Sequence, residues 1–261
     1  FLYVDAGHGG WLGWDRMAAA FVKLVCVDLG VSPRLLRGFS TNVANYNGVG
    51  EPCPPEAFEG AMNAGRFCNH RLTRNHSCCA APNDDCRRVP RYSSGFAEIV
   101  YAQTLAKHAK EQCVDEGGQP LFEPRVVIDS GRAGNSDART PEQCHDWCNL
   151  RTAGVGPTPT TSTPLPELVD ALFWVKYPGE SDGCSEVLPS GDRCARYDAG
   201  CGRATSLGSG EREPSAPEAG QWFAAHVLSL ARNAHLHFSG GVGHGLLRGE
   251  HVPSAAEERA A

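Results

Sequence analysis

The fold is decided by residues 1–14, which read Phe1-Leu2-Tyr3-Val4-Asp5-Ala6-Gly7-His8-Gly9-Gly10-Trp11-Leu12-Gly13-Trp14. The opening apolar run predicts a β-strand over residues 1–5, followed by a glycine-rich loop over residues 6–14 that carries a histidine and two tryptophans. In a barrel of alternating strands and helices, ligands bind at the C-terminal ends of the strands. A carboxylate beside exposed indole rings suits a sugar, whose apolar faces stack on aromatic rings. The opening stretch therefore predicts a strand end that binds carbohydrate.

Strands, polar turns and helices alternate along the rest of the chain. We expect strands at 35–40, 125–129 and 172–176, and helices at 15–29, 96–112 and 217–233. This alternation predicts an α/β fold with parallel strands and short crossovers. Residues 48–92 hold cysteines and prolines without periodicity, so we expect an irregular insertion tied by disulfides. We expect a rigid Pro/Thr-rich surface loop at 155–166 and a frayed tail at 250–261.

Length and composition limit the class of protein. The chain has 261 residues, 41% of them hydrophobic, and a net charge of −6 with acidic and basic residues interspersed. The charge argues against a nucleic-acid surface, which needs a concentrated basic face. An uninterrupted run of 18 apolar residues is lacking, so we expect no membrane partner. The first residues lack the charged start of a signal peptide, so any such signal is expected to have been removed or to lie outside this sequence.

The cysteine content indicates an oxidising compartment. Twelve cysteines are scattered through predicted loops, which favours structural disulfides and a secreted, extracellular protein. Zinc is the alternative, but Cys78-Cys79 and the pair Cys144 and Cys148 do not have the spacing of paired zinc knuckles. The sequence Asn75-His76-Ser77 is an acceptor for N-glycosylation, in agreement with secretion.

Five blocks of sequence, in order, resemble glycoside hydrolase family 6, the cellobiohydrolases and endoglucanases that cut β-1,4-glucan with inversion. They are Asp5–Trp14, Arg37–Asn47, Asp129–Gly134, Asp146–Asn149 and Trp174–Gly183, and Ala216–Phe223 resembles the family's closing helix. The resemblance implies a distorted (β/α) barrel with long disulfide-tied loops. Residues 1–261 would form a single partial catalytic domain, the C-terminal portion of that barrel, with 48–92 as an insertion.

The resemblance also implies catalytic roles. Asp182 is similar to the family's candidate general base, which would activate water directly or through a water chain. Lys176 and Arg132 would be its charge partners, because a nearby positive charge keeps a carboxyl ionised. Asp5 would be the carboxylate that supports the reacting subsite. The family implies no cofactor, and we expect no metal.

Substrate-binding roles follow in the same way. The tryptophans would be stacking platforms, Trp11 and Trp14 on the leaving-group side and Trp147 on the non-reducing side. Asn45, His8 and Glu180 would hydrogen-bond to glucosyl hydroxyls. Cys148 and Cys201 match the two cysteines that bridge in the family's cellobiohydrolases, and Cys184 with Cys194 is a second candidate pair.

Structural interpretations compete with several of these roles. Trp174 and Trp222 lie in apolar periodic runs and are expected in the core. His8 is equally well explained as a structural histidine, Arg132 as a surface residue or part of a structural ion pair, and Asp182 as a cap or turn residue. The Gly-rich surroundings of Trp11 and Trp14 favour ligand contact over loop packing.

The expected activity is inverting hydrolysis of β-1,4-glucosidic bonds in cellulose or cello-oligosaccharides. The family's endoglucanases have a short connection where this sequence has the long, cysteine-containing segment 184–216, and its exo-acting enzymes have a long, disulfide-tied one. The resemblance therefore implies an exo-acting cellobiohydrolase, in which a lid formed by this segment would hold a chain end. In the family, the aspartate that protonates the glycosidic oxygen lies upstream of the block that opens this sequence, so we expect the general acid to be absent from residues 1–261. Three explanations are open: the sequence is a fragment of a complete enzyme, the missing N-terminal segment is supplied by another chain, or the protein is a non-catalytic glucan-binding extracellular glycoprotein. The first is favoured because the other active-site residues are present together.

Overall fold

A parallel sheet organises the protein. The computed structural model describes residues 2–29, 35–79, 95–135, 138–139 and 144–234. Its sheet has the order β1-β2-β3-β4, with all neighbours parallel. The strands are Leu2–Asp5, Leu36–Thr41, Arg125–Asp129 and Val169–Phe173. The predicted α/β fold is confirmed, and β3 has the bounds that its β-branched run predicted.

The main helices follow the predicted periodicity. They are α2 (Asp15–Lys23), which continues into a π-helical turn at Leu24–Asp28, α4 (Glu98–Gln112) and α5 (Ala224–Arg232). A short helix, α1 (Gly9–Leu12), lies where a loop was expected. It forms because His8 Nδ1 accepts a hydrogen bond from the Gly10 N–H and so caps the first turn. Gly9 has no room for a side chain, since a Cβ there would lie 2.1 Å from the carbonyl oxygen of Gly95.

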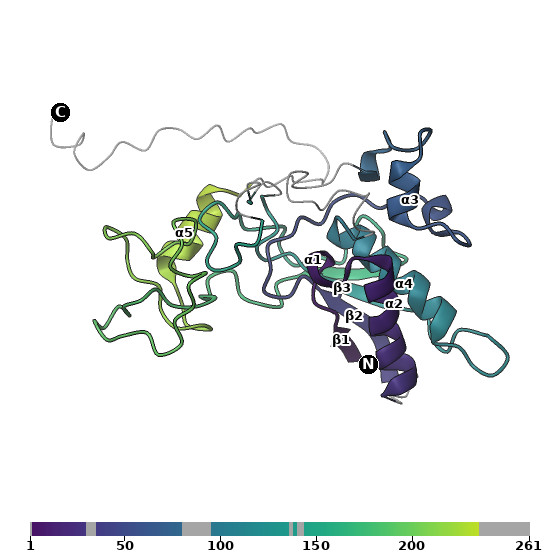
Figure 1. Ribbon diagram of the computed structural model, residues 1–261, viewed down its shortest axis with the longest axis horizontal. Coiled ribbons are helices and arrows are strands. Elements are labelled where there is room, and N and C mark those ends of the chain that lie inside the picture. Colours follow the sequence, from purple (N-terminus) through teal and green to yellow (C-terminus); the bar gives the residue numbers. More distant parts are fainter. Residues whose placement is uncertain (1, 30–34, 80–94, 136–137, 140–143, 235–261) are drawn as a thin grey trace.

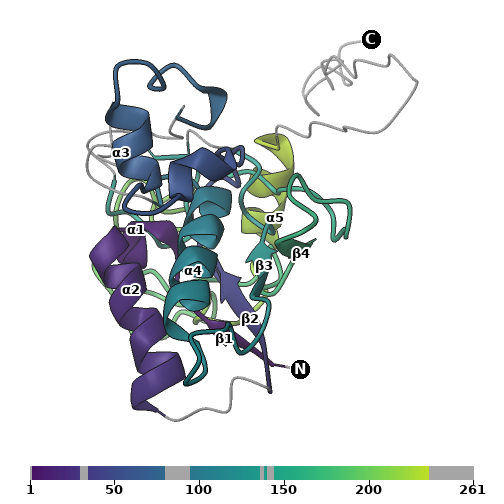
Figure 2. The same ribbon diagram turned by 90° about the vertical axis from the view of Figure 1, so that its right-hand side faces the viewer.

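One face of the sheet carries the core. Helices α2 and α4 lie together on this face, and α5 lies apart from them (Figures 1 and 2). Phe39 of β2 packs with Val22 of α2 and Leu105 of α4. Val126 and Ile128 of β3 pack with the next turns of α4. All five of these side chains are fully buried, so hydrophobic burial fixes the sheet against the helices.

The opposite face of the sheet carries a polar network. Asp170 of β4 accepts hydrogen bonds from Tyr3 of β1 at 2.6 Å and from Arg37 of β2 at 2.8 and 3.0 Å. Arg125 of β3 lies 3.7 Å from the same carboxylate. One side chain from every strand therefore meets at Asp170. The guanidinium of Arg37 lowers the pKa of Asp170, so the carboxylate stays ionised.

Two expected elements are displaced. The strand expected at 172–176 is observed at Val169–Phe173, because Leu168, Val169 and Leu172 are the residues that reach the core. Lys176 then lies in the following loop. The helix expected from residue 217 begins at Ala224, because Gly220 has φ +81° and residues 180 and 222 form an isolated bridge instead.

The cysteine-rich insertion is more regular than expected. Its described part holds α3 (Ala64–Asn69) and short 3-10 turns at Pro55–Phe58 and Ser77–Cys79. This lobe projects beyond one end of α4 (Figure 1). Two disulfides, Cys53–Cys78 and Cys68–Cys79, close it. Residues 80–92 of the expected insertion, and the expected tail at 250–261, lie outside the described residues.

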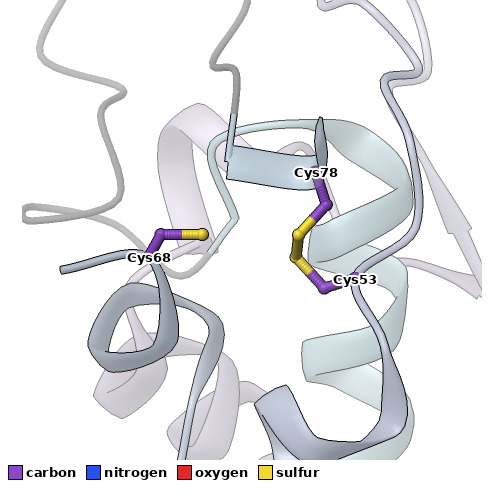
Figure 3. A group of neighbouring side chains, drawn as sticks. All are labelled: Cys53, Cys68 and Cys78. Carbon is purple, nitrogen blue, oxygen red and sulfur yellow. A yellow bond between two sulfur atoms is a disulfide. The ribbon is translucent and has the colours of Figure 1, made fainter. Parts of the chain in front are cut away.

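Disulfides also join the other loops. Cys26–Cys113 ties the π-helical turn after α2 to the residue that follows α4. The expected pairs Cys148–Cys201 and Cys184–Cys194 are both present. Figure 3 shows Cys68 beside the Cys53–Cys78 bridge. These three sulfurs are close enough to share a metal ion, but each is bonded to another sulfur and has no thiolate to offer. Among the described helices, none is long and apolar enough to cross a membrane.

Candidate active site

A buried ion cluster lies beyond the C-terminal ends of the strands. Asp182 Oδ1 lies 2.8 Å from the Arg132 guanidinium and 2.6 Å from Lys176 Nζ. Asp182 Oδ2 accepts hydrogen bonds from the Tyr46 hydroxyl and, at 2.9 Å, from the Asn149 N–H. The Asp182 side chain is only 5% exposed and that of Arg132 only 2%. The structure thus brings together three of the four residues expected to be catalytic.

The charges of this cluster keep it ionised. Burial alone would raise the pKa of Asp182, but the positive charges of Arg132 and Lys176, with hydrogen bonds from Lys176 and Tyr46, outweigh burial and hold that pKa far below its usual range. Burial raises the pKa of Tyr46 well above its usual value, so its hydroxyl stays protonated and donates to Asp182. One carboxylate therefore accepts bonds from four donor residues in a site almost closed to water.

Asp129, the last residue of β3, holds the three loops that build the cluster. Its carboxylate accepts the N–H of Gly131 at 2.9 Å, of Lys176 at 3.0 Å and of Ala44 at 3.2 Å. Burial raises its pKa against the effect of these hydrogen bonds. Because the Asp129 carboxylate accepts backbone N–H groups from the segments after β2, β3 and β4, it fixes the relative positions of these three segments.

The backbone at the site is strained at non-glycine residues. Asn42, Ala44 and Asn149 have φ values of +62°, +60° and +43°. Each such residue costs about 1–3 kcal/mol, which persists only where surrounding bonds enforce it. The Ala44 carbonyl accepts from Arg132, and Asn149 Oδ1 accepts the Asp182 N–H at 2.8 Å. Ala44 and Asn149 therefore contact the ion cluster directly, whereas Asn42 donates from Nδ2 to the Asp129 carbonyl at 2.9 Å.

Asp5 stands apart from the cluster. It ends β1, is exposed, and accepts a hydrogen bond from the Gly7 N–H at 2.8 Å. Its position at the same end of the sheet is the one expected. Its support of a reacting subsite stays a prediction.

Three expected platforms are solvent-exposed. Trp11 of α1 is 69% exposed, Trp14 43% and Trp147 44%. His8 is buried, and its ring centroid lies 4.6 Å from that of Trp11. Because His8 Nδ1 caps α1, the structural interpretation of this histidine accounts for its position. The indoles themselves are free to stack on a ligand.

The two remaining expected sugar contacts differ in their surroundings. Asn45 is buried, and its Oδ1 accepts a hydrogen bond from Arg139 at 3.0 Å. Glu180 is half-buried, and its backbone forms an isolated bridge with Trp222. Their contacts with a sugar stay predictions.

The expectation that Trp174 and Trp222 are core residues is wrong for both, and most clearly for Trp222. It is 63% exposed, because α5 begins after it and its indole lies at the rim of an apolar hollow near α5. Trp174 is half-buried, and its Nε1 donates to the Pro157 carbonyl at 2.8 Å. The apolar run at 172–176 predicted a strand through Trp174, but β4 ends at Phe173 and the chain bends after it.

The segment expected to be a lid is fastened beside Trp147. The buried carboxylate of Asp146 accepts hydrogen bonds from Arg203 and Thr205. The Cys148–Cys201 disulfide lies next to these bonds. A Cβ on Gly183, the residue after Asp182, would lie 2.7 Å from Cys201 Sγ, so the disulfide packs directly behind the ion cluster.

Sequence reasoning missed several residues that build the site. Tyr46, Asn149 and Asp129 lay inside the quoted blocks but had no assigned role. Arg139 was not singled out at all. Asp129 ends β3 and Tyr46 lies in the polar turn after β2, a signal that identifies a region and not a particular contact, whereas Arg139 and Asn149 lie within the long loop after β3 and carry no such signal.

Known proteins resemble this chain over most of its length. Residues 1–234 match the family model described as glycosyl hydrolases family 6. The chain belongs to this family. Exoglucanase 3 of Agaricus bisporus is 35% identical over 236 residues, which cover 89% of this chain and 41% of that protein. The chain is the equivalent of a partial catalytic domain with a distorted-barrel fold and disulfide-tied loops.

Solved structures of the family have the same fold. The catalytic core domain of the cellobiohydrolase Cel6A from Chaetomium thermophilum matches with a TM-score of 0.61 and 33% identity, over 89% of this chain and 50% of that one. Cellobiohydrolase II (Cel6A) from Humicola insolens, in complex with glucose and cellotetraose, matches with a TM-score of 0.59 and 32% identity, over 89% and 50% of the two chains. The chain thus spans about half of each of these solved domains.

Proposed function

We propose that this chain takes part in inverting hydrolysis of β-1,4-glucosidic bonds in cellulose, as a cellobiohydrolase that acts on chain ends. The observation that carries the proposal is the buried Asp182 cluster, which lies where strand ends place active sites and is accompanied by exposed indoles. The Humicola insolens relative was solved with cellotetraose, which supports cello-oligosaccharides as ligands.

Asp182 acts on water indirectly in this proposal. An inverting enzyme needs a base that activates a water on the face opposite the leaving group. The Asp182 carboxylate is nearly closed to solvent and accepts from Arg132, Lys176, Tyr46 and Asn149, so little of it is free to meet that water. Its low pKa also makes it a weak base at neutral pH. We therefore place Asp182 at the far end of a chain of waters. The attacking water becomes strongly acidic as its oxygen bonds to the anomeric carbon, so its proton can pass along the chain even to this weak base, while the charge of Asp182 holds Lys176 and Arg132 in position.

The leaving group needs a separate acid. In the proposal, this carboxyl group comes from polypeptide outside residues 1–261. That accords with coverage of only half of the solved family domains. In this proposal, residues 1–261 supply the candidate base of the cleft and the aromatic platforms.

Action on chain ends is supported by the fastening of the lid. Arg203, Thr205 and Cys201 all hold the segment after Cys184 against residues 146–148. A segment fixed beside Trp147 would restrict entry from the side and favour threading of a chain end.

The test is hydrolysis by the gene product that contains residues 1–261. We expect release of cellobiose with inverted anomeric configuration from cellulose, and loss of release in Asp182→Asn. Asp192→Asn, at an exposed aspartate of the same region, is the matched control and should retain activity. Unchanged hydrolysis in Asp182→Asn would contradict the role of Asp182, and no hydrolysis by the wild type would contradict the activity.

A non-catalytic glucan-binding protein is not favoured. Exposed tryptophans alone would suffice for binding, whereas two cations and a carboxylate buried together are costly to desolvate and are not needed to bind a sugar.

We also propose an extracellular location. Five disulfides among the described residues favour an oxidising compartment. Asn75 of the glycosylation acceptor lies in an exposed turn, where a transferase can reach it. Secretion from a eukaryotic host should give a protein whose mass falls on enzymatic removal of N-glycans, and Asn75→Gln should abolish that change. An unglycosylated protein retained in the cytosol would contradict the location.

A further inference from the structure

The two groups of platforms belong to different parts of the chain. Trp11 lies on α1, between β1 and α2, whereas Trp147 follows β3 by a long loop. A glucan that contacts both needs them at a fixed separation, because binding groups lose effect when they are misplaced by more than about 0.5 Å. A connection between the two segments would therefore set the length of glucan that the protein binds.

On the Trp11 side, the connection begins at Glu98, the buried first residue of α4. Its Oε1 accepts the Gly9 N–H at 2.9 Å, at the start of α1. The same oxygen accepts from Asn47 Nδ2 at 2.5 Å. The Asn47 amide also lies 3.3 Å from the His8 ring, which contacts Trp11. Asn47 is thus fastened to the helix that carries the platform.

On the Trp147 side, the connection ends at Asp146. Its backbone carbonyl accepts a hydrogen bond from Arg139 Nε at 2.8 Å. Its carboxylate holds Arg203 and Thr205 of the lid. The residue immediately before the platform is therefore fixed on both its backbone and its side chain.

Arg139 joins the two sides. Its side chain donates from Nε to the Asp146 carbonyl, from one terminal nitrogen to Asn47 Oδ1 at 3.2 Å, and from the other to Asn45 Oδ1 at 3.0 Å. The residue is 5% exposed, and its guanidinium lies 5.7 Å from the centroid of the Tyr46 ring. Only a planar guanidinium presents three donors in such a fixed fork.

We propose that Arg139 is a positioning residue that sets the separation of the Trp11 and Trp147 platforms and so selects for glucans long enough to span them. The proposal rests on the proposed function, since it assumes that both indoles bind one glucan. Arg139 itself is buried and needs no contact with sugar. A short oligosaccharide held by one platform would bind without its help.

The test compares cellobiose with cellohexaose by calorimetry on the full chain, for wild type, Arg139→Met and Arg139→Lys. We expect Arg139→Met to weaken cellohexaose binding about 10- to 100-fold, the range that follows a misplacement of about 1 Å. Cellobiose binding should be unchanged. Arg139→Lys keeps the positive charge but lacks the planar guanidinium, and should give an intermediate loss of cellohexaose affinity. Arg193→Met, at an arginine whose side chain is 86% exposed, is the matched control.

A second measurement does not depend on sugar. The indole N–H resonances of Trp11 and Trp147 should both shift in Arg139→Met and in the folded Arg139→Lys, but not in Arg193→Met. If both shift and the wild type binds no oligosaccharide, the structural link stands and the proposed function fails. Unshifted resonances, or equal losses for cellobiose and cellohexaose, would overturn the role of Arg139.

Discussion

Lys176 Nζ and Asp182 Oδ1 lie 2.6 Å apart, and the Arg132 guanidinium lies 2.8 Å from the same carboxylate oxygen. The carboxylate therefore balances two cations in a site where its side chain is only 5% exposed. Breaking a buried ion pair from one side is strongly destabilising, because the remaining charge has lost its partner.

Asp182→Asn should accordingly lower the free energy of unfolding at pH 7 by about 3–5 kcal/mol. Urea denaturation measures this change, and the exposed Asp192→Asn should alter it by less than about 0.5 kcal/mol. Since the folded pKa of Asp182 is depressed, its contribution is present above the pKa of an unfolded aspartate and is lost as the pH falls toward the folded pKa. Equal stability of the two variants would show that the cluster does not hold the fold.

His226 of α5 predicts a loss of stability in mild acid. Its ring is fully buried, and neither ring nitrogen has a hydrogen-bond partner within the described residues. Burial and the positive charges of Arg132 and Lys176 lower its pKa, and the negative charge of Asp182 raises it. The net result is a fall of the pKa from 6.5 to about 4. Between these values the unfolded state binds more protons than the folded state, so stability falls as the pH drops from 6.5 to 4.

His226→Phe removes this sensitivity. Between pH 7 and pH 4, wild type should lose about 3 kcal/mol more stability than His226→Phe, the free energy of a shift of this size. Parallel denaturation curves at several pH values measure the difference. His70→Phe, at an exposed histidine of the cysteine-rich lobe, should leave the wild-type slope intact. Identical slopes for wild type and His226→Phe would refute the prediction.

The sequence predicted the elements better than the contacts. The apolar residues at 125–129 predicted β3 to the residue, because burial dictates a strand that packs under α4. The run at 172–176 misled because its backbone bends where Asp129 accepts the Lys176 N–H. That bond joins residues 47 apart in the sequence, so no local pattern reveals it.

The same difference between predictable residues and unpredictable contacts holds for the candidate site. Resemblance located Asp182, Lys176 and Arg132, and the structure brings them together. It did not indicate that Asn45 would be bound to Arg139, since that bond spans 94 residues. Family motifs identify residues that contact a ligand, whereas supporting residues are known only once the chain is folded.

The exposed indoles predict where cello-oligosaccharides bind. Trp11→Ala and Trp147→Ala should each weaken binding of a long cello-oligosaccharide at least about fivefold, since a stacked aromatic contributes about 1 kcal/mol beyond the area it buries. Trp222→Ala removes an indole beside α5 that is 63% exposed, between Trp147 at 44% and Trp11 at 69%, and should leave affinity unchanged. Titration calorimetry measures all three variants. A loss in Trp222→Ala as large as in Trp147→Ala would place the sugar elsewhere.

The Cys148–Cys201 disulfide is expected to restrict how a glucan chain enters the cleft. It closes a separation of 53 residues and holds the lid beside Trp147, so Cys148→Ser with Cys201→Ser should lower stability by about 2–5 kcal/mol and free the lid. Side entry into the cleft should then raise the share of reducing ends left on insoluble cellulose. Cys26→Ser with Cys113→Ser opens a separation of 87 residues far from the lid, and should lower stability comparably without changing that share. An equal rise in both variants would mean that lower stability, and not lid opening, changes the products.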